Sequence, residues 1–325
     1  MAERKDYSVI ILWIMICAII AIAIPSLFAR KYYVKLMQKK TFSFPEVSPV
    51  PLYIRTHTIK IDLSHPRAIS KGVDDTFLVA GDNMLVKYNM EGKEIMRFRT
   101  DEPVQCIATD TDGTIFAGYK NRVVVLAPDC RFVSEMPELG EKAYLTSLAV
   151  TSNHVFSADY GNRIVWCFDK TGKLSGKIDG VTSSSPRGFI LPSPYFDIAA
   201  APDGNLWIVN PGLLRLQKHT PAGGLVSTWG KPSPSIEDFC GCCNPAHIAV
   251  GENGFIVTSE KGIPRIKVYD ETGRFTGVVT AYDKELSGIA GMDIAIDSNG
   301  RILVLDGKAC AVHIFVSKAG KKTEQ

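Results

Sequence analysis

The sequence predicts an all-β protein, a six-bladed β-propeller that follows one N-terminal apolar segment. The first observation is a short apolar phrase that recurs every 38 to 50 residues, each time followed by turn residues and further short apolar runs. A period of roughly 40 to 50 residues built from short strands is typical of propeller blades. The copies are Ala68-Ile69-Ser70, Cys106-Ile107-Ala108, Ser147-Leu148-Ala149, Asp197-Ile198-Ala199, His247-Ile248-Ala249 and Asp293-Ile294-Ala295.

The second observation is the N-terminal segment from Val9 to Phe28, which contains no charged residue. A helix of this length spans about 30 Å, the thickness of the hydrocarbon core of a bilayer. We therefore expect residues 1–40 to be a single-pass transmembrane anchor with a basic flank. A signal peptide cleaved after Ala21-Ile22-Ala23 is the alternative, and the length of the apolar run favours the retained anchor.

The charge of the chain is concentrated next to this segment. Residues 1–40 hold seven Lys or Arg and two Asp or Glu, whereas the remainder holds 30 basic and 32 acidic residues. The globular part therefore has no bias toward nucleic acid, and no nucleic-acid partner is expected. Basic residues after the segment, such as Arg30 and Lys31, favour a cytoplasmic propeller, whereas an anchor followed by a large domain is also compatible with export.

The region after the anchor divides into a linker and the propeller. Residues 41–51 contain three prolines and little periodicity, which is typical of a linker. Residues 52–325 form the propeller. Its sixth repeat runs out after a third strand, because residues 317–325 are short and polar. The alternating segment 52–63 precedes the first repeat, and we expect it to close the ring beside residues 311–316 and so remove an exposed strand edge.

The third repeat shows most clearly how a blade is built. Strands are expected at residues 145–150, 155–158, 163–168 and 173–178, separated by turns rich in Gly, Asn and Asp. The phrase SADYGNRIVWCFDKTGK within it resembles the NHL repeat, which carries an apolar strand, Ala-Asp, a Gly-Asn turn and Arg-Ile. This resemblance covers most of residues 65–316 and implies a six-bladed propeller of a class that includes both binding modules and enzymes.

The first residues of the inner strands are candidates for a site, because these strands line the central channel of a propeller. Three consecutive blades begin with Asp197, His247 and Asp293, and the second strands of two of these blades end with Asn210 and Glu260. Oxygen ligands with a histidine suit a divalent metal such as Ca, Mg, Mn or Fe. The alternative is that these side chains cap turns and satisfy backbone donors.

The loop before the fifth repeat contains Cys240, Cys242 and Cys243. It is compatible with a disulfide or redox pair, or with a turn without chemistry. A soft-metal or Fe–S centre held by the three thiolates fits less well, because C-x-C-C matches no common zinc or ferredoxin pattern. Arg187 and Arg265 are candidate anion-binding residues, since either guanidinium can clamp a carboxylate or phosphate.

These observations leave three functions open. The interpretation that we favour is a membrane-anchored module that binds a protein partner or a small ligand at the channel face. The first alternative is a metal-dependent lactonase, hydrolase or lyase, in which the ion would polarise a substrate or activate water. The second is a redox protein that uses the cysteine cluster. The sequence does not identify a cofactor beyond a candidate divalent metal.

Overall fold

The computed structural model describes residues 50–183, 185–281, 286 and 291–319. The chain divides into two compact units, 1–48 and 49–325, and all described residues belong to the second. The expected anchor at Val9 to Phe28 lies outside the described residues. Within the described ranges, no helix combines the length and the apolar character that crossing a bilayer requires.

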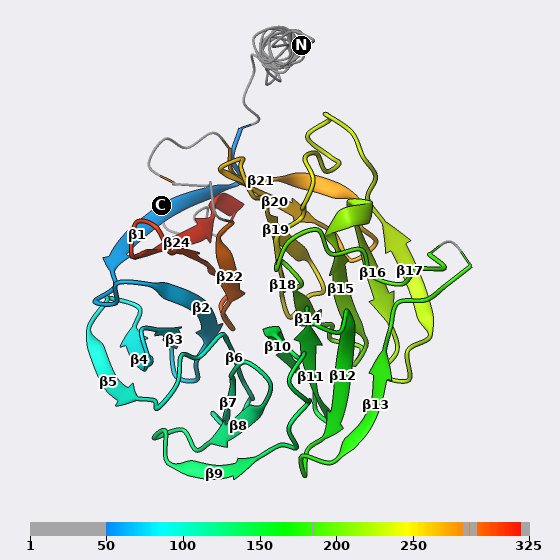
Figure 1. Cartoon of the computed structure of the whole chain (residues 1–325). Helices are drawn as coiled ribbons and strands as arrows, with labels where there is room; N and C mark the ends of the chain where they lie inside the picture. The colour runs from blue at the N-terminus through cyan, green and yellow to red at the C-terminus, as the bar shows by residue number, and fades with distance from the viewer. Residues whose placement is uncertain (1–49, 184, 282–285, 287–290, 320–325) are drawn as a thin grey trace, which may run out of the picture. The chain divides into compact units, whose positions relative to one another are not determined.

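The second unit is a six-bladed β-propeller, as predicted (Figure 1). Six four-stranded antiparallel sheets surround a central channel, and the first strand of each sequence repeat is innermost. Blade one contains β2 (Pro66–Lys71), β3 (Thr76–Gly81), β4 (Met84–Asn89) and β5 (Glu94–Arg99). Blade two contains β6 (Cys106–Thr109), β7 (Ile115–Gly118), β8 (Val123–Leu126) and β9 (Phe132–Glu135). Blade three contains β10 (Leu145–Val150), β11 (His154–Asp159), β12 (Ile164–Asp169) and β13 (Leu174–Ile178).

The remaining blades follow the same order around the ring. Blade four contains β14 (Ile198–Ala200), β15 (Leu206–Asn210), the 3₁₀ turn η1 (Pro211–Leu213), β16 (Arg215–His219) and β17 (Leu225–Trp229). Blade five contains β18 (His247–Val250), β19 (Ile256–Ser259), β20 (Arg265–Tyr269) and β21 (Phe275–Ala281). Blade six contains β22 (Asp293–Ile296), β23 (Ile302–Asp306), β24 (Ala311–Ser317) and β1 (Tyr53–Lys60).

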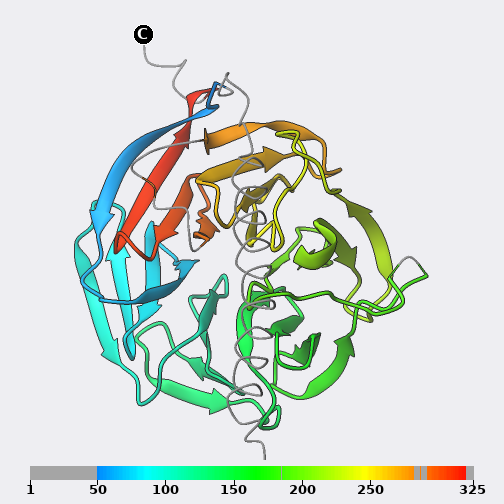
Figure 2. The same ribbon diagram turned by 45° about the horizontal axis from the view of Figure 1, so that its top comes forward.

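Strand β1, which lies at the N-terminal end of the propeller sequence, is the fourth strand of blade six. It pairs antiparallel with β24, from Tyr53 opposite Ser317 to Lys60 opposite Ala311. Figure 2 shows the blue β1 lying along the outer side of the red β24. Because β1 uses the backbone groups that β24 would otherwise leave open, the last blade has four strands like the others.

The same hairpin turn closes the outer strands of blades three and five. The Asp169 carboxylate accepts hydrogen bonds from the backbone N–H groups of Thr171 and Lys173, at 2.9 and 3.0 Å. Gly172 follows with a φ of 87°, a backbone conformation that strongly favours glycine. The sequence Asp-x-Thr-Gly therefore specifies this turn locally, and it recurs at residues 270–273 of blade five.

The hydrophobic core lies between blades rather than in one central mass. Six clusters of buried apolar side chains each join two neighbouring blades in the described part of the chain. One of them joins blades six and one through Ile59 of β1, Phe77 of β3 and Val312 of β24. Each cluster includes at least one aliphatic side chain of an inner strand that also lines the channel, and the polar side chains at the start of the inner strands meet beside them.

Candidate functional site

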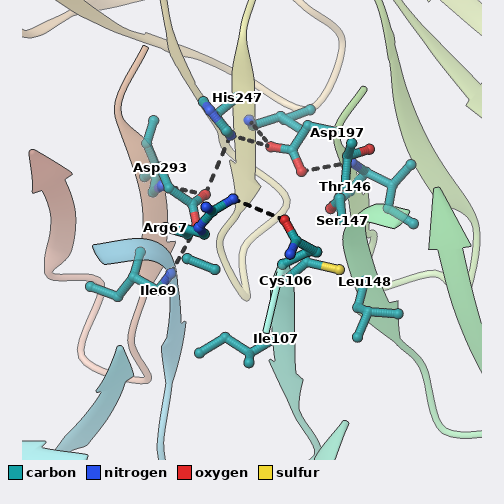
Figure 3. Close-up of a pocket in the computed structure, with 15 residues that line it drawn as sticks. Arg67, Ile69, Cys106, Ile107, Thr146, Ser147, Leu148, Asp197, His247 and Asp293 are labelled. Carbon is teal, nitrogen blue, oxygen red and sulfur yellow. Dashed lines mark hydrogen bonds and ion pairs between the residues drawn. The ribbon is translucent and has the colours of Figure 1, made fainter. Parts of the chain in front are cut away.

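Asp197, His247 and Asp293 meet at one mouth of the channel (Figure 3). His247 and Asp293 are the first residues of β18 and β22, and Asp197 directly precedes β14. These three inner strands belong to consecutive blades, and each is in contact with the next. Equivalent positions in successive repeats therefore bring together residues that are about 50 residues apart in the chain.

The His247 imidazole lies between the two carboxylates. Its Nδ1 is 3.4 Å from Asp197 Oδ2 and 3.5 Å from Asp293 Oδ1. The candidate ligand atoms of the three residues all lie within 4.8 Å of one another, and no other group of three His, Cys, Asp or Glu does so among the residues that the structure describes. This spacing suits a single small cation with mixed oxygen and nitrogen ligands.

Both carboxylates also tie neighbouring blades together. Asp197 Oδ2 accepts a hydrogen bond from the backbone N–H of Ile248 in blade five, at 2.8 Å. Asp293 Oδ2 accepts one from the backbone N–H of Ile69 in blade one, also at 2.8 Å. The other oxygen of each carboxylate accepts from the N–H of the following residue, Ile198 or Ile294. These donors orient the carboxylates, and each oxygen retains a lone pair that can face a cation.

The three side chains perturb one another electrostatically. Burial raises the pKa of Asp293, and the Asp197 carboxylate adds to this against the opposing effect of His247, so that the pKa reaches about 6. Burial lowers the pKa of His247, but the hydrogen bond to Asp197 and the charge of Asp293 outweigh it and raise the pKa above its ordinary value. Burial raises the pKa of Cys106 at the start of β6 well above the ordinary thiol value, and the two carboxylates add to this. A concentration of shifted pKa values in a concave site is typical of functional sites.

Two adjoining cavities surround this group. A narrow one of about 70 Å³ lies in the channel and is lined by all three residues. A wider one of about 400 Å³ opens toward the loops that enter the inner strands, and His247 and Asp293 line both. The site therefore has room for a small molecule directly above the candidate ligands.

The wider cavity has cationic walls that sequence reasoning missed. Arg67 and Lys308 line it, and Asp293 is the single acidic residue among its described lining residues. Arg67 donates a hydrogen bond from Nη1 to Gln105 Oε1 at 3.0 Å, and both residues line the two cavities. Figure 3 shows the Arg67 side chain beside Asp293. Arg67 lies one residue before the repeated phrase Ala68-Ile69-Ser70 of blade one. This position at the start of an inner strand is the sequence feature that could have identified Arg67 as a site residue.

Asn210 and Glu260 do not join the trio and line neither cavity. Asn210 is fully buried, accepts a hydrogen bond from the Ile190 N–H at 3.0 Å, and donates to Gln217 Oε1 at 2.9 Å. Glu260 is fully buried and forms ion pairs with Arg265 and Lys267 of β20. Glu260 thus holds the interior of blade five together, and Asn210 ties blade four to the segment that precedes it.

The two candidate anion-binding arginines lie apart from the cavities as well. Arg265 is buried, and its guanidinium is paired with Glu260. Arg187 is exposed in the long segment between β13 and β14. The anion-binding role therefore fits Arg67 better than either residue.

The three cysteines of the loop before blade five do not form one cluster, because Cys240 lies apart from the pair Cys242 and Cys243. The Cys240 thiol is 3.9 Å from the Arg265 guanidinium, inside the buried ion-pair network. Cys242 and Cys243 instead point together, with their sulfur atoms 3.2 Å apart. Three thiolates do not converge on one point among the described residues, which gives no support to a metal or Fe–S centre there.

Comparisons with known proteins show the fold alone. Neither a protein-family model nor a curated protein matches the sequence. A solved streptogramin B lyase is 14% identical with a TM-score of 0.58, covering 82% of this chain and 98% of that one. Virginiamycin B lyase from Staphylococcus aureus is 13% identical with a TM-score of 0.57, covering 81% and 99%. A protein of unknown function from Bacteroides thetaiotaomicron is 14% identical with a TM-score of 0.58, covering 81% and 72%.

These neighbours confirm the six-bladed propeller. They are too distant in sequence to carry an activity to this chain. The resemblance to NHL repeats remains an expectation, because no family model matches.

Proposed function

We propose that the channel mouth binds a small anionic ligand and that Asp197, His247 and Asp293 hold a divalent cation that acts on it, as in a lyase or hydrolase. The observation that carries this proposal is the convergence of one imidazole and two carboxylates, all within 4.8 Å, beneath a cavity of about 400 Å³. Two of the structural neighbours are lyases by name, which supports a lyase as one form of this proposal.

The neighbouring residues suit an anionic group on the ligand. A carboxylate or phosphate oxygen that approaches the cation would also face Arg67, whose guanidinium can bind it in a bidentate manner. Lys308 adds a second positive charge to the same wall. The cation would polarise the ligand and stabilise the negative charge that develops as a bond breaks.

Metal binding by the purified full-length protein tests this proposal. After chelation and dialysis, we expect one Mn²⁺ per chain, measured by electron paramagnetic resonance and calorimetry. His247→Ala should weaken the affinity by about 10- to 100-fold or more, since it removes a ligand. Asp159→Asn is the matched control, because Asp159 is a buried acid in blade three that lines neither cavity.

The proposal is wrong if the wild-type protein binds no stoichiometric divalent ion, or if His247→Ala binds it with unchanged affinity. Arg67→Ala should retain the ion and lose the affinity of the loaded protein for a small dicarboxylate or a phosphate monoester. Arg187→Ala should change neither, because Arg187 lines neither cavity.

Binding of a protein partner is a second candidate function, and the outer strands favour it. Phe132 and Val133 of β9 are 61% and 56% exposed, and Ile95 of β5 and Val226 of β17 are also exposed. Phe132 and Val133 are adjacent in the sequence, so we place the partner contact at β9. Under this function Phe132→Ser should reduce partner capture, whereas His247→Ala should leave it intact.

We also propose that residues 9–28 anchor the propeller to a membrane, on the basis of their uncharged sequence. The full-length protein should stay with membranes through high-salt and alkaline carbonate washes. Protection of the propeller from added protease in sealed vesicles then tells on which side it lies. A mature N-terminus at Ile24 would show instead that the segment is a cleaved signal.

A further inference from the structure

The loop before blade five presents two thiols side by side. Cys242 is exposed and Cys243 is 3% exposed, and their sulfur atoms are 3.2 Å apart. The third thiol, on Cys240, faces Arg265 in the buried ion-pair network. The loop therefore offers a pair in which one sulfur reaches solvent and the other lies directly behind it.

The backbone around the pair is held in place by Asn244. This side chain is 2% exposed and accepts a hydrogen bond from the Lys261 N–H at 2.7 Å. Its amide group donates to the carbonyl oxygens of Cys240 at 2.7 Å and of Lys261 at 3.2 Å. One side chain thus fastens the cysteine loop to the β19–β20 turn, so the approach of the two sulfurs belongs to a built structure.

The surroundings of Cys243 favour its use as the second thiol of a pair. Burial raises the pKa of Cys243 and the neighbouring Cys242 adds to this, while Ser193 and the charge of Lys261 act in the opposite direction. The Lys261 ammonium also lies 5.0 Å from the centre of the Tyr195 ring, beside the same loop. A buried thiol next to a cation is shielded from bulk reagents, and it can be deprotonated when a neighbouring sulfur becomes its target.

We propose that Cys242 and Cys243 form a dithiol that exchanges with small-molecule disulfides and closes reversibly to a disulfide. The exposed Cys242 thiolate attacks one sulfur of the disulfide RSSR, which forms a mixed disulfide and releases RS⁻. Cys243 then loses its proton and attacks the Cys242 sulfur, which forms the Cys242–Cys243 bond and releases the second RS⁻. In sum, two protein thiols are oxidised and one RSSR is reduced to two RSH.

A disulfide substrate fits this pair better than a metal ion. No third His, Cys, Asp or Glu ligand atom joins the two sulfurs within 4.8 Å among the described residues, so a stable soft-metal site lacks ligands. A bond between adjacent cysteines closes a small ring and strains the peptide between them, and strained disulfides are readily reduced again. The pair therefore suits turnover rather than permanent cross-linking. This activity is independent of the proposed cation site.

Glutathione disulfide is the probe that tests the proposal. The parent protein for this test is the full-length chain with the substitutions Cys17→Ser and Cys310→Ser, in which the remaining thiols outside the loop are buried. After reduction and removal of the reductant, it is incubated with glutathione disulfide, alkylated and analysed by peptide mass spectrometry. We expect two glutathione molecules released per chain, no retained adduct, and a loss of two hydrogen atoms localised to Cys242 and Cys243.

Three single variants in this background separate the roles of the thiols. Cys243→Ser should stop at a glutathione adduct on Cys242, because the second attack cannot occur. Cys242→Ser should not react, because Cys243 is buried. Cys240→Ser should behave as the parent does, which distinguishes the proposed pair from a Cys240–Cys242 disulfide. Circular dichroism melting curves show whether each variant is folded, and Cys242→Ala repeats the Cys242 test with a different side chain.

The proposal is overturned if the parent retains the adduct as Cys243→Ser does, since the pair would then not close. It is equally overturned if closure requires Cys240, or if the folded parent fails to react with glutathione disulfide.

Discussion

The buried Lys267 of β20 should make the free energy of unfolding depend measurably on pH. Its side chain is fully buried, its ammonium donates to the Asp238 carbonyl oxygen at 2.6 Å, and the Glu260 carboxylate lies 3.6 Å away. The ammonium also lies 4.1 Å from the centre of the Phe239 ring. Burial disfavours the charged form more strongly than Glu260 favours it, so the pKa of Lys267 falls from 10.5 to about 7.

The sign and the size of the effect follow from this shift. Between pH 7 and 10.5 the unfolded chain keeps the Lys267 proton and the folded chain loses it, so the free energy of unfolding rises with pH across this window. The penalty of burying the charged form is fully present below pH 7. Each pKa unit corresponds to about 1.4 kcal/mol, so raising the pH from 7 to 8.5 should add about 1.5 kcal/mol.

Urea unfolding of the full-length protein at pH 6, 7, 7.75 and 8.5, followed by tryptophan fluorescence, measures this slope. Lys267→Met is the control, since it keeps an apolar chain of similar length and cannot titrate. Ionisation of buried cysteines in the unfolded chain affects both proteins alike, so the difference between their slopes isolates Lys267. Equal slopes for the two proteins would refute a neutral buried lysine.

Two further predictions concern the closure of the ring and the turns. Ile59→Ala in β1 should cost about 2–4 kcal/mol of unfolding free energy, because the side chain is 6% exposed between blades one and six. Lys60→Ala, which alters the neighbouring exposed residue, should change the unfolding free energy by less than about 0.5 kcal/mol. Similar losses in the two variants would contradict closure by apolar packing. Asp159→Ala should cost about 2–4 kcal/mol, because its carboxylate accepts from the Tyr144 N–H at 3.0 Å and from Trp166 Nε1 at 3.0 Å. Urea titration with an unchanged midpoint for Asp159→Ala would show that these donors find other partners.

Much of the fold could be predicted because its signals are local and repeated. Strands expected at residues 145–150 and 173–178 are found at Leu145–Val150 and Leu174–Ile178. Alternating apolar residues, and turns such as Asp169 to Gly172, specify strands and hairpins without reference to the rest of the chain. The ring then places equivalent residues of successive repeats side by side, which is why Asp197, His247 and Asp293 could be grouped in advance.

The partners of the other polar side chains depended on the tertiary structure. Glu260 had the position in its repeat expected for the site, yet it pairs with Arg265 and Lys267 inside blade five. Cys240 lies two residues from Cys242, yet its thiol faces Arg265 while Cys242 faces Cys243.

The physical reason is that sequence spacing determines which element a residue occupies and its place along that element. A buried charge or thiol takes the partner that best offsets its loss of hydration, and several partners are within reach of each of these residues. Which partner it takes depends on the packing of neighbouring strands and loops. The sequence by itself therefore determined the six blades and the inner-strand trio, whereas only the folded chain decided the ion-pair network, the cationic wall of the cavity and the paired thiols.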